Sequence, residues 1–194
     1  MMFRRLFSLV PPLLMMTSIG LAKSWQLEKT TTNTEKGPVD ITMLTVTERD
    51  HGEDVALRVG CRADGVVSAS LRLSKPTESE DVIATATARY VPVLIDFPRE
   101  RPTRIFLRST LGDRLLHFDD PSTQMADPEN ELLDLERWTV EKLVRRLASS
   151  SKITFGVSID GSQDFQESFN IAGFRELAAP LANQCPKLGE WLSR

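Results

Sequence analysis

The sequence is poor in the side chains on which most enzyme and metal sites depend. It contains two cysteines, two histidines and one tyrosine among 194 residues. His51 and His117 are each isolated in a polar or turn context, and neither has a spacing typical of a zinc site. No serine lies in a G-x-S-x-G setting, and the glycine patterns of nucleotide-binding loops are absent. We therefore predict a protein that is not an enzyme and has no catalytic residue, metal ligand or cofactor.

Long apolar runs and excess positive charge are also missing from most of the chain. Beyond residue 22, no apolar stretch is long enough to cross a bilayer. The 24 basic and 27 acidic residues give a formal net charge of −3, so there is no electrostatic case for binding nucleic acid. We find no internal repeat and no domain linker. These absences favour a single domain without a membrane span after the first 22 residues.

The first 22 residues, MMFRRLFSLVPPLLMMTSIGLA, have the three parts of a secretory signal peptide. Arg4 and Arg5 form the positive region, an uncharged apolar stretch follows, and small residues lie near Ala22. An uncleaved membrane anchor is the alternative, but two prolines interrupt the middle of the stretch. We expect cleavage near Ala22 and a single β-rich domain of residues 23–194 that is periplasmic or secreted.

One cysteine lies on a predicted β-hairpin. Cys61 shares its alternating apolar face with Val55, Leu57 and Val59, so we expect it to point into the core. Asp64-Gly65 follows, which is typical of a short hairpin turn in which both central residues have positive φ. Apolar alternation then resumes over residues 67–73, as expected for the second strand.

The other cysteine lies at the end of a predicted amphipathic helix. Its apolar positions recur at a spacing of three and four residues and are Phe174, Leu177, Ala178, Leu181, Ala182 and Cys185. Pro180 predicts a kink, and Pro186 predicts the end of the helix. Cys185 would then face the core.

We predict a disulfide between Cys61 and Cys185, because two inward-facing cysteines in an exported protein are expected to pair. In the chain-entropy model, closing a loop of roughly 100 residues contributes about 4–5 kcal/mol. The alternative is that each cysteine is a small buried hydrophobic residue. A redox-catalytic pair is not expected, because the chain has no C-x-x-C spacing.

Strand patterns dominate the rest of the chain. We expect strands at residues 25–27, 39–48, 55–61, 67–73, 82–90, 104–109, 114–118, 152–160 and 164–171. Residues 91–97 either continue the strand of 82–90 or start a second one after Pro92. A helix is predicted over residues 135–147, where apolar side chains fall on one face. The predicted fold is mainly β, an antiparallel β-sandwich with one internal and one C-terminal α-helix.

An acidic segment, residues 118–134, separates the strands from the internal helix. Its carboxylates could supply oxygen ligands for calcium and are Asp119, Asp120, Asp127, Glu129, Glu131 and Asp134. The spacing differs from that of the twelve-residue calcium loop, and the central glycine is missing. We favour a solvated loop, with calcium binding as the alternative.

The spacing of several residues resembles two groups of small exported proteobacterial proteins. The residues are Trp25, Leu57-x-Val59-x-Cys61, Leu147-Ala148-Ser149, the segments ITFGVSI and FQESFNIAGF, and Leu177, Leu181 and Cys185. The spacing is similar to that of the VasI-like, type VI secretion-associated periplasmic proteins and of the invasion-associated locus B proteins. In the first family a phenylalanine, a glycine and a terminal cysteine recur, at the places of Phe169, Gly173 and Cys185. The segment IDFPRERPTRIFLRST lacks the arginine-aspartate and tryptophan signals of that family. The resemblance implies a fold and a compartment, and no catalytic site.

The expected function is therefore binding. The leading hypothesis is a non-enzymatic exported protein that binds a protein partner or an envelope component, with an accessory role in a secretion apparatus as one form. The alternative is a small-molecule or calcium-binding periplasmic module. A hydrolase is the third class, and the sequence supplies no constellation for it.

Overall fold

The computed structural model describes most of the chain beyond residue 24. The described residues are 25–34, 37–50, 53–74, 83–84, 89–109, 114–118, 138–158 and 164–193. The predicted signal peptide, His51 and the six acidic residues of the calcium hypothesis lie outside them.

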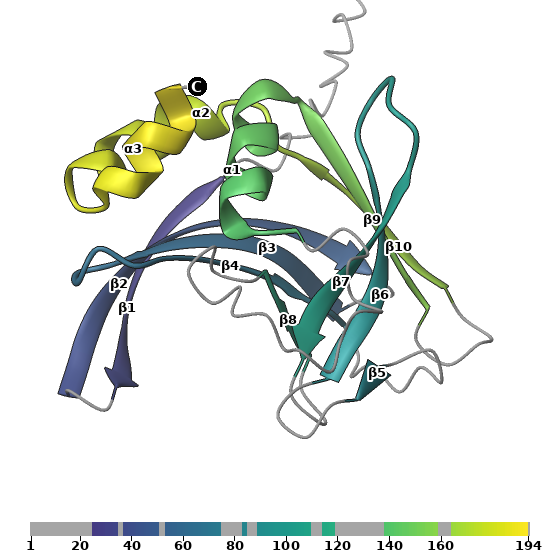
Figure 1. Ribbon diagram of the computed structural model, residues 1–194, viewed down its shortest axis with the longest axis horizontal. Helices are drawn as coiled ribbons and strands as arrows, with labels where there is room; N and C mark the ends of the chain where they lie inside the picture. The colour runs from purple at the N-terminus through teal and green to yellow at the C-terminus, as the bar shows by residue number, and fades with distance from the viewer. Residues whose placement is uncertain are drawn as a thin grey trace, which may run out of the picture.

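Ten strands form one antiparallel sheet, which confirms the mainly β class (Figure 1). The strands are β1 (Gln26–Thr34), β2 (Gly37–Asp50), β3 (Glu53–Arg62), β4 (Val67–Arg72), β5 (Ile83–Ala84), β6 (Arg89–Asp96), β7 (Thr103–Ser109), β8 (Leu115–His117), β9 (Lys152–Ser158) and β10 (Asp164–Asn170). Their spatial order is β1-β2-β3-β4-β8-β7-β6-β9-β10, and β5 pairs with the beginning of β6. The four N-terminal strands thus form one half of the sheet, and β6, β7, β9 and β10 form most of the other.

The sheet bends strongly, so that β10 contacts β2 although the two strands are far apart in the spatial order. Figure 1 shows the helices on the concave side, with α1 (Val140–Ser149) between the two halves of the sheet. The strands expected in a sandwich therefore belong to one continuous hydrogen-bonded sheet that folds over its own helices. We call the concave side of the sheet the inner face and the opposite side the outer face.

The inner face and the helices together form the hydrophobic core. Alternate residues of β3, from Val55 to Cys61, are fully buried, as the sequence pattern predicts. Helix α1 buries residues at a three-four spacing, namely Val140, Leu143, Val144 and Leu147. Thr139 caps this helix, because its hydroxyl accepts a hydrogen bond from the backbone N–H of Lys142 at 3.2 Å.

The β3–β4 hairpin is confirmed, but its turn differs from the expected type. Gly65 has φ +85°, and Asp64 does not have positive φ. The N–H of Arg62 donates to the carbonyl of Val66, and the N–H of Gly65 donates to the carbonyl of Arg62, both at 2.9 Å. These bonds enclose a three-residue loop with glycine in the left-handed region, so only one residue needs positive φ.

The C-terminal helix is divided into three segments: α2 (Phe174–Ala178), the 3₁₀ helix η3 (Ala179–Asn183) and α3 (Pro186–Ser193). Pro180 lies in the first turn of η3, which agrees with the predicted kink. Pro186 separates η3 from a further helix that the sequence analysis did not predict. Proline is well suited to the first helical position, because the N–H it lacks has no partner there. Among the described residues, no helix is both long and apolar enough to cross a membrane.

Candidate functional site

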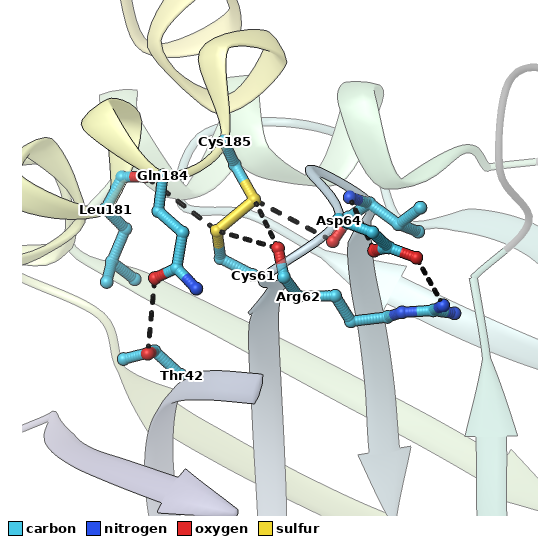
Figure 2. The surroundings of a disulfide bond; sticks show 8 residues. Thr42, Cys61, Arg62, Asp64, Leu181, Gln184 and Cys185 are labelled. Carbon is cyan, nitrogen blue, oxygen red and sulfur yellow. Dashed lines mark hydrogen bonds and ion pairs between the residues drawn. A yellow bond between two sulfur atoms is a disulfide. The ribbon is translucent and has the colours of Figure 1, made fainter. Parts of the chain in front are cut away.

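The predicted disulfide between Cys61 and Cys185 is present (Figure 2). The sulfur atoms are 2.04 Å apart, the Cα atoms are 6.0 Å apart, and neither cysteine is exposed. The bond joins the turn end of β3 to the residue just before α3. It therefore attaches the C-terminal helical segment to the β-sheet and leaves no free cysteine in the chain.

Backbone carbonyl oxygens surround the disulfide. The Sγ atom of Cys185 lies 3.6 Å from the carbonyl oxygen of Arg62, and that of Cys61 lies 3.8 Å from the carbonyl oxygen of Leu181. Because bonded sulfurs carry no proton, these are packing contacts rather than hydrogen bonds. Thr42 reaches the side-chain oxygen of Gln184 at 3.4 Å beside them (Figure 2). The geometry is that of a buried structural cross-link without access for a reactant.

His117 is the one histidine within the described residues, and it lies in β8. Cross-strand pairing places it between Ser70 of β4 and Arg108 of β7. Within the part of the chain that the structure describes, no group of three or more histidine, cysteine, aspartate or glutamate side chains could hold a metal ion. The calcium hypothesis concerns residues outside that part.

Pairing in the sheet also aligns polar residues in a row across the outer face. The successive cross-strand partners are Thr45, Arg58, Ser70, His117, Arg108 and Tyr90. Neighbouring members are up to 47 positions apart in the sequence, as with Ser70 and His117. This row could not be predicted from the sequence, because alternation predicts only the face on which a residue lies and does not identify its neighbour on the next strand.

At the end that begins with Thr45, this row opens into a groove of about 670 Å³ over β1 to β4. Its lining residues are Gln26, Glu28, Thr45, Thr47, Arg49, Asp54, Ala56, Arg58 and Arg72. We call it the arginine groove. A second hollow of about 340 Å³ lies nearer the disulfide and includes Thr42 and Gln184.

Both carboxylates of the arginine groove have partners of their own. Asp54 forms an ion pair with Arg49, with 3.6 Å between Oδ1 and Nε. Glu28 accepts a hydrogen bond from the hydroxyl of Thr45 at 3.3 Å. Neither carboxylate forms an ion pair with Arg58 or Arg72, the two remaining arginines of the groove.

No described residue forms a hydrogen bond or an ion pair with the guanidinium group of Arg58 or of Arg72. The Nε atom of Arg58 is buried and lacks a hydrogen-bond partner. Arg62, four residues further along β3, instead pairs with Asp64 at 2.6 Å. The arginine groove thus presents two permanently charged groups that can bind an anion, since guanidinium does not lose its proton in proteins.

Comparisons of the chain with protein-family models, with curated proteins and with solved structures find no match. The resemblance to VasI-like and invasion-associated locus B proteins therefore stays a prediction. The arginine groove is assigned on the geometry of this molecule alone.

Proposed function

We propose that the protein is a non-enzymatic exported binding protein that holds an anionic protein partner or envelope component on the outer face of its sheet. The observation that carries this proposal is the arginine groove, where Arg58 and Arg72 lie together without partners among the described residues. Neutralising two unpaired positive charges is a clear reason for this surface to bind an anion.

The position of the groove favours binding through the outer face. The described helices lie on the inner face (Figure 1), so no described helix covers the arginine groove. Strands β1 to β4 that carry it are paired along most of their length. A hydrogen-bonded sheet fixes the backbone positions from which these side chains project before the ligand arrives, which reduces the entropy lost on binding.

The disulfide supports the exported location. Disulfides persist in oxidising compartments such as the periplasm and the extracellular space, and they are rare in the cytosol. Cys61 and Cys185 form such a bond and are fully buried. Together with the signal-peptide pattern of the first 22 residues, this supports export followed by cleavage near Ala22.

The chemistry of the groove supports binding rather than catalysis. Its described side chains are arginine, threonine, glutamine and carboxylates that are already paired. Arginine cannot act as a general base because it remains protonated. Neither threonine of the groove has a histidine or lysine among the other lining residues to activate its hydroxyl.

The test is crosslinking of a tagged protein in cells, followed by affinity capture from the envelope fraction and mass spectrometry. The variant Arg58→Met/Arg72→Met is compared with Arg175→Met/Lys187→Met, which removes the same charge from exposed positions on the helical side. We expect a partner that the wild type and the helical-side variant retain and the groove variant loses. Capture that is equal in all three proteins would contradict the proposal.

The same experiment tests the location and the predicted secretion role. The protein's own peptides should begin near Lys23 if the signal peptide is cleaved. A groove-dependent partner that belongs to a secretion apparatus would support the accessory role implied by the resemblance.

A further inference from the structure

We infer that the arginine groove binds a phosphate monoester group, anchored by Arg58 and Arg72. The inference rests on the proposed binding function and specifies the chemistry that the outer face recognises. It follows from four observations: the placement of the two arginines, the charge they leave uncompensated, the donors around them and the size of the groove.

Arg58 and Arg72 are diagonal neighbours on adjacent strands. In the register of β3 and β4, Arg72 pairs with Ala56 and Arg58 pairs with Ser70. Both side chains therefore project from the outer face, and their positions differ by two residues along the strand direction. Long side chains at diagonal positions of an antiparallel pair lie within reach of one another. Two like charges in this arrangement repel each other unless an anion lies between them.

The two arginines without an ion-pair partner suit an anion that can bind both of them. The groove contains three arginines and two carboxylates, and the ion pair of Arg49 with Asp54 and the hydrogen bond of Glu28 to Thr45 account for both carboxylates. Because the hydrogen bond from Thr45 leaves Glu28 charged, the groove keeps a net charge of +1, and Arg58 and Arg72 have no ion-pair partner among the described residues. A phosphate monoester carries about −1.5 to −2 charges at pH 7, whereas a carboxylate carries one. A monoester therefore has enough charge and enough oxygen atoms to pair with both arginines, and a single carboxylate can form a bidentate pair with only one of them.

The donors of the groove suit phosphate oxygens. Each guanidinium presents a planar fork of N–H groups that matches two oxygens of one phosphate. The Nε of Arg58 is a buried donor without a partner, and no described residue forms a hydrogen bond with the hydroxyl of Thr47. A phosphate with three free oxygens can accept from the terminal N–H groups of both arginines and from the hydroxyl of Thr47, and from the Nε of Arg58 once that side chain turns toward the ligand.

The size of the groove suits a phosphate group carried by a larger molecule. A volume of about 670 Å³ falls within the range of small-molecule sites, and it exceeds the volume of a single phosphate. The side chains of Arg49 and Asp54 at its border are 69% and 60% exposed, so the groove is open to solvent on that side. A phosphorylated headgroup or sugar can therefore enter while the rest of its molecule remains outside.

The experiment titrates the purified exported protein with phenyl phosphate, inorganic phosphate and acetate. The readout is two-dimensional NMR of backbone amides and of arginine Nε–H groups. We expect saturable shifts at β3 and β4 with phenyl phosphate, including a change at the Nε–H of Arg58. Acetate should bind at least about tenfold more weakly, since a monoanion forms one charge-assisted pair where the monoester forms two. Acetate binding as tight as that of phenyl phosphate would overturn the inference.

Three variants separate the effect of the bidentate guanidinium geometry from the effect of positive charge. Arg58→Lys/Arg72→Lys retains both charges, and we expect it to weaken phenyl phosphate binding by about tenfold, because lysine cannot bind bidentately. Arg58→Met/Arg72→Met should abolish binding, and Arg175→Met/Lys187→Met should leave it unchanged. Equal shifts in the wild type and in the double methionine variant would overturn the inference.

The source of the phosphate is tested with vesicles. Vesicles that carry a monoester lipid headgroup are compared with vesicles that carry only phosphodiester headgroups at equal surface charge. Binding to the first alone assigns the ligand to a lipid, and binding of soluble phenyl phosphate without vesicle binding assigns it to a soluble molecule. If no phosphate binds while envelope capture still depends on Arg58 and Arg72, this inference fails and the proposed function stands. If neither phosphate binding nor envelope capture depends on Arg58 and Arg72, both proposals fail.

Discussion

Arg58 combines a buried donor with an uncompensated positive charge, a combination that folding alone does not favour. Its Nε is shielded from water and has no hydrogen-bond partner. A buried polar group without a partner costs about 1–3 kcal/mol, and more when it is charged. Such a residue lowers the stability of the free protein, as is common at binding sites where function requires an unsatisfied group.

Replacing Arg58 by methionine should therefore leave the protein at least as stable as the wild type. Methionine keeps an aliphatic stem that packs against the sheet and removes the unsatisfied donor. We expect the free energy of unfolding to stay the same or to rise by up to about 1–3 kcal/mol. Urea denaturation of the exported protein measures this change.

The matched control for this stability measurement is Arg145→Met on α1. Arg145 forms an ion pair with Glu141 one helical turn away. Losing that pair should lower the free energy of unfolding by about 0.3–0.5 kcal/mol. A large loss of stability in Arg58→Met would show that Arg58 has a structural partner and would contradict the assignment of the groove.

At the scale of the elements, alternation and spacing predicted much of the fold. The β3–β4 hairpin, the inward direction of Cys61 and the kink at Pro180 follow from local patterns, and the structure contains all three. Helix α3 was missed, because Pro186 was interpreted only as the end of a helix. The position of Arg72 beside Arg58 depends on pairing between strands, so it required the register as well as the pattern.

The β3–β4 turn allows the energetic cost of an unfavourable backbone conformation to be measured without any change in side-chain packing. Gly65 has φ +85°, and a Cβ atom added there would meet no atom within 4 Å. Gly65→Ala should lower the free energy of unfolding by about 1–2 kcal/mol, from backbone strain alone. Gly65→Asn should cost less, since asparagine tolerates the left-handed region. Equal losses for the two variants in urea denaturation would show that strain at this residue is not the cause.

The start of α1 depends on its cap. The hydroxyl of Thr139 accepts the backbone N–H of Lys142 and satisfies one of the free donors of the first turn. Thr139→Ala should lower the free energy of unfolding by about 1 kcal/mol, and Thr139→Ser should restore most of it. Thermal and urea denaturation of both variants measure the difference. A serine variant as unstable as the alanine variant would contradict a capping role.

At the scale of the whole molecule, contacts between distant parts of the chain hold the sheet and helices together. β10 contacts β2, and the ring of Trp25, just before β1, lies 5.0 Å from that of Phe174 in α2. The disulfide joins residues separated by 124 positions. Such long-range contacts are costly to form during folding, because each requires a large loop to close. The cross-link removes part of that cost once it has formed.

Reduction of the disulfide should therefore lower the global stability rather than loosen one end of the chain. The chain-entropy model gives about 4–5 kcal/mol for a loop of this length, and native disulfides typically contribute about 2–5 kcal/mol. We expect the urea midpoint of the reduced protein to fall accordingly. Denatured but unreduced protein should show no labelled thiol.

A variant with Cys61→Ala and Cys185→Ala separates the cross-link from the packing of the sulfur atoms. Both cysteines are fully buried, so the variant loses the cross-link and also leaves small cavities. It should be at least as unstable as the reduced wild type, which retains both sulfur atoms. If the reduced wild type unfolds at the same urea concentration as the oxidised protein, loop closure does not stabilise this fold. The contacts of β10 with β2 and of Trp25 with Phe174 would then be sufficient to hold the helices against the sheet.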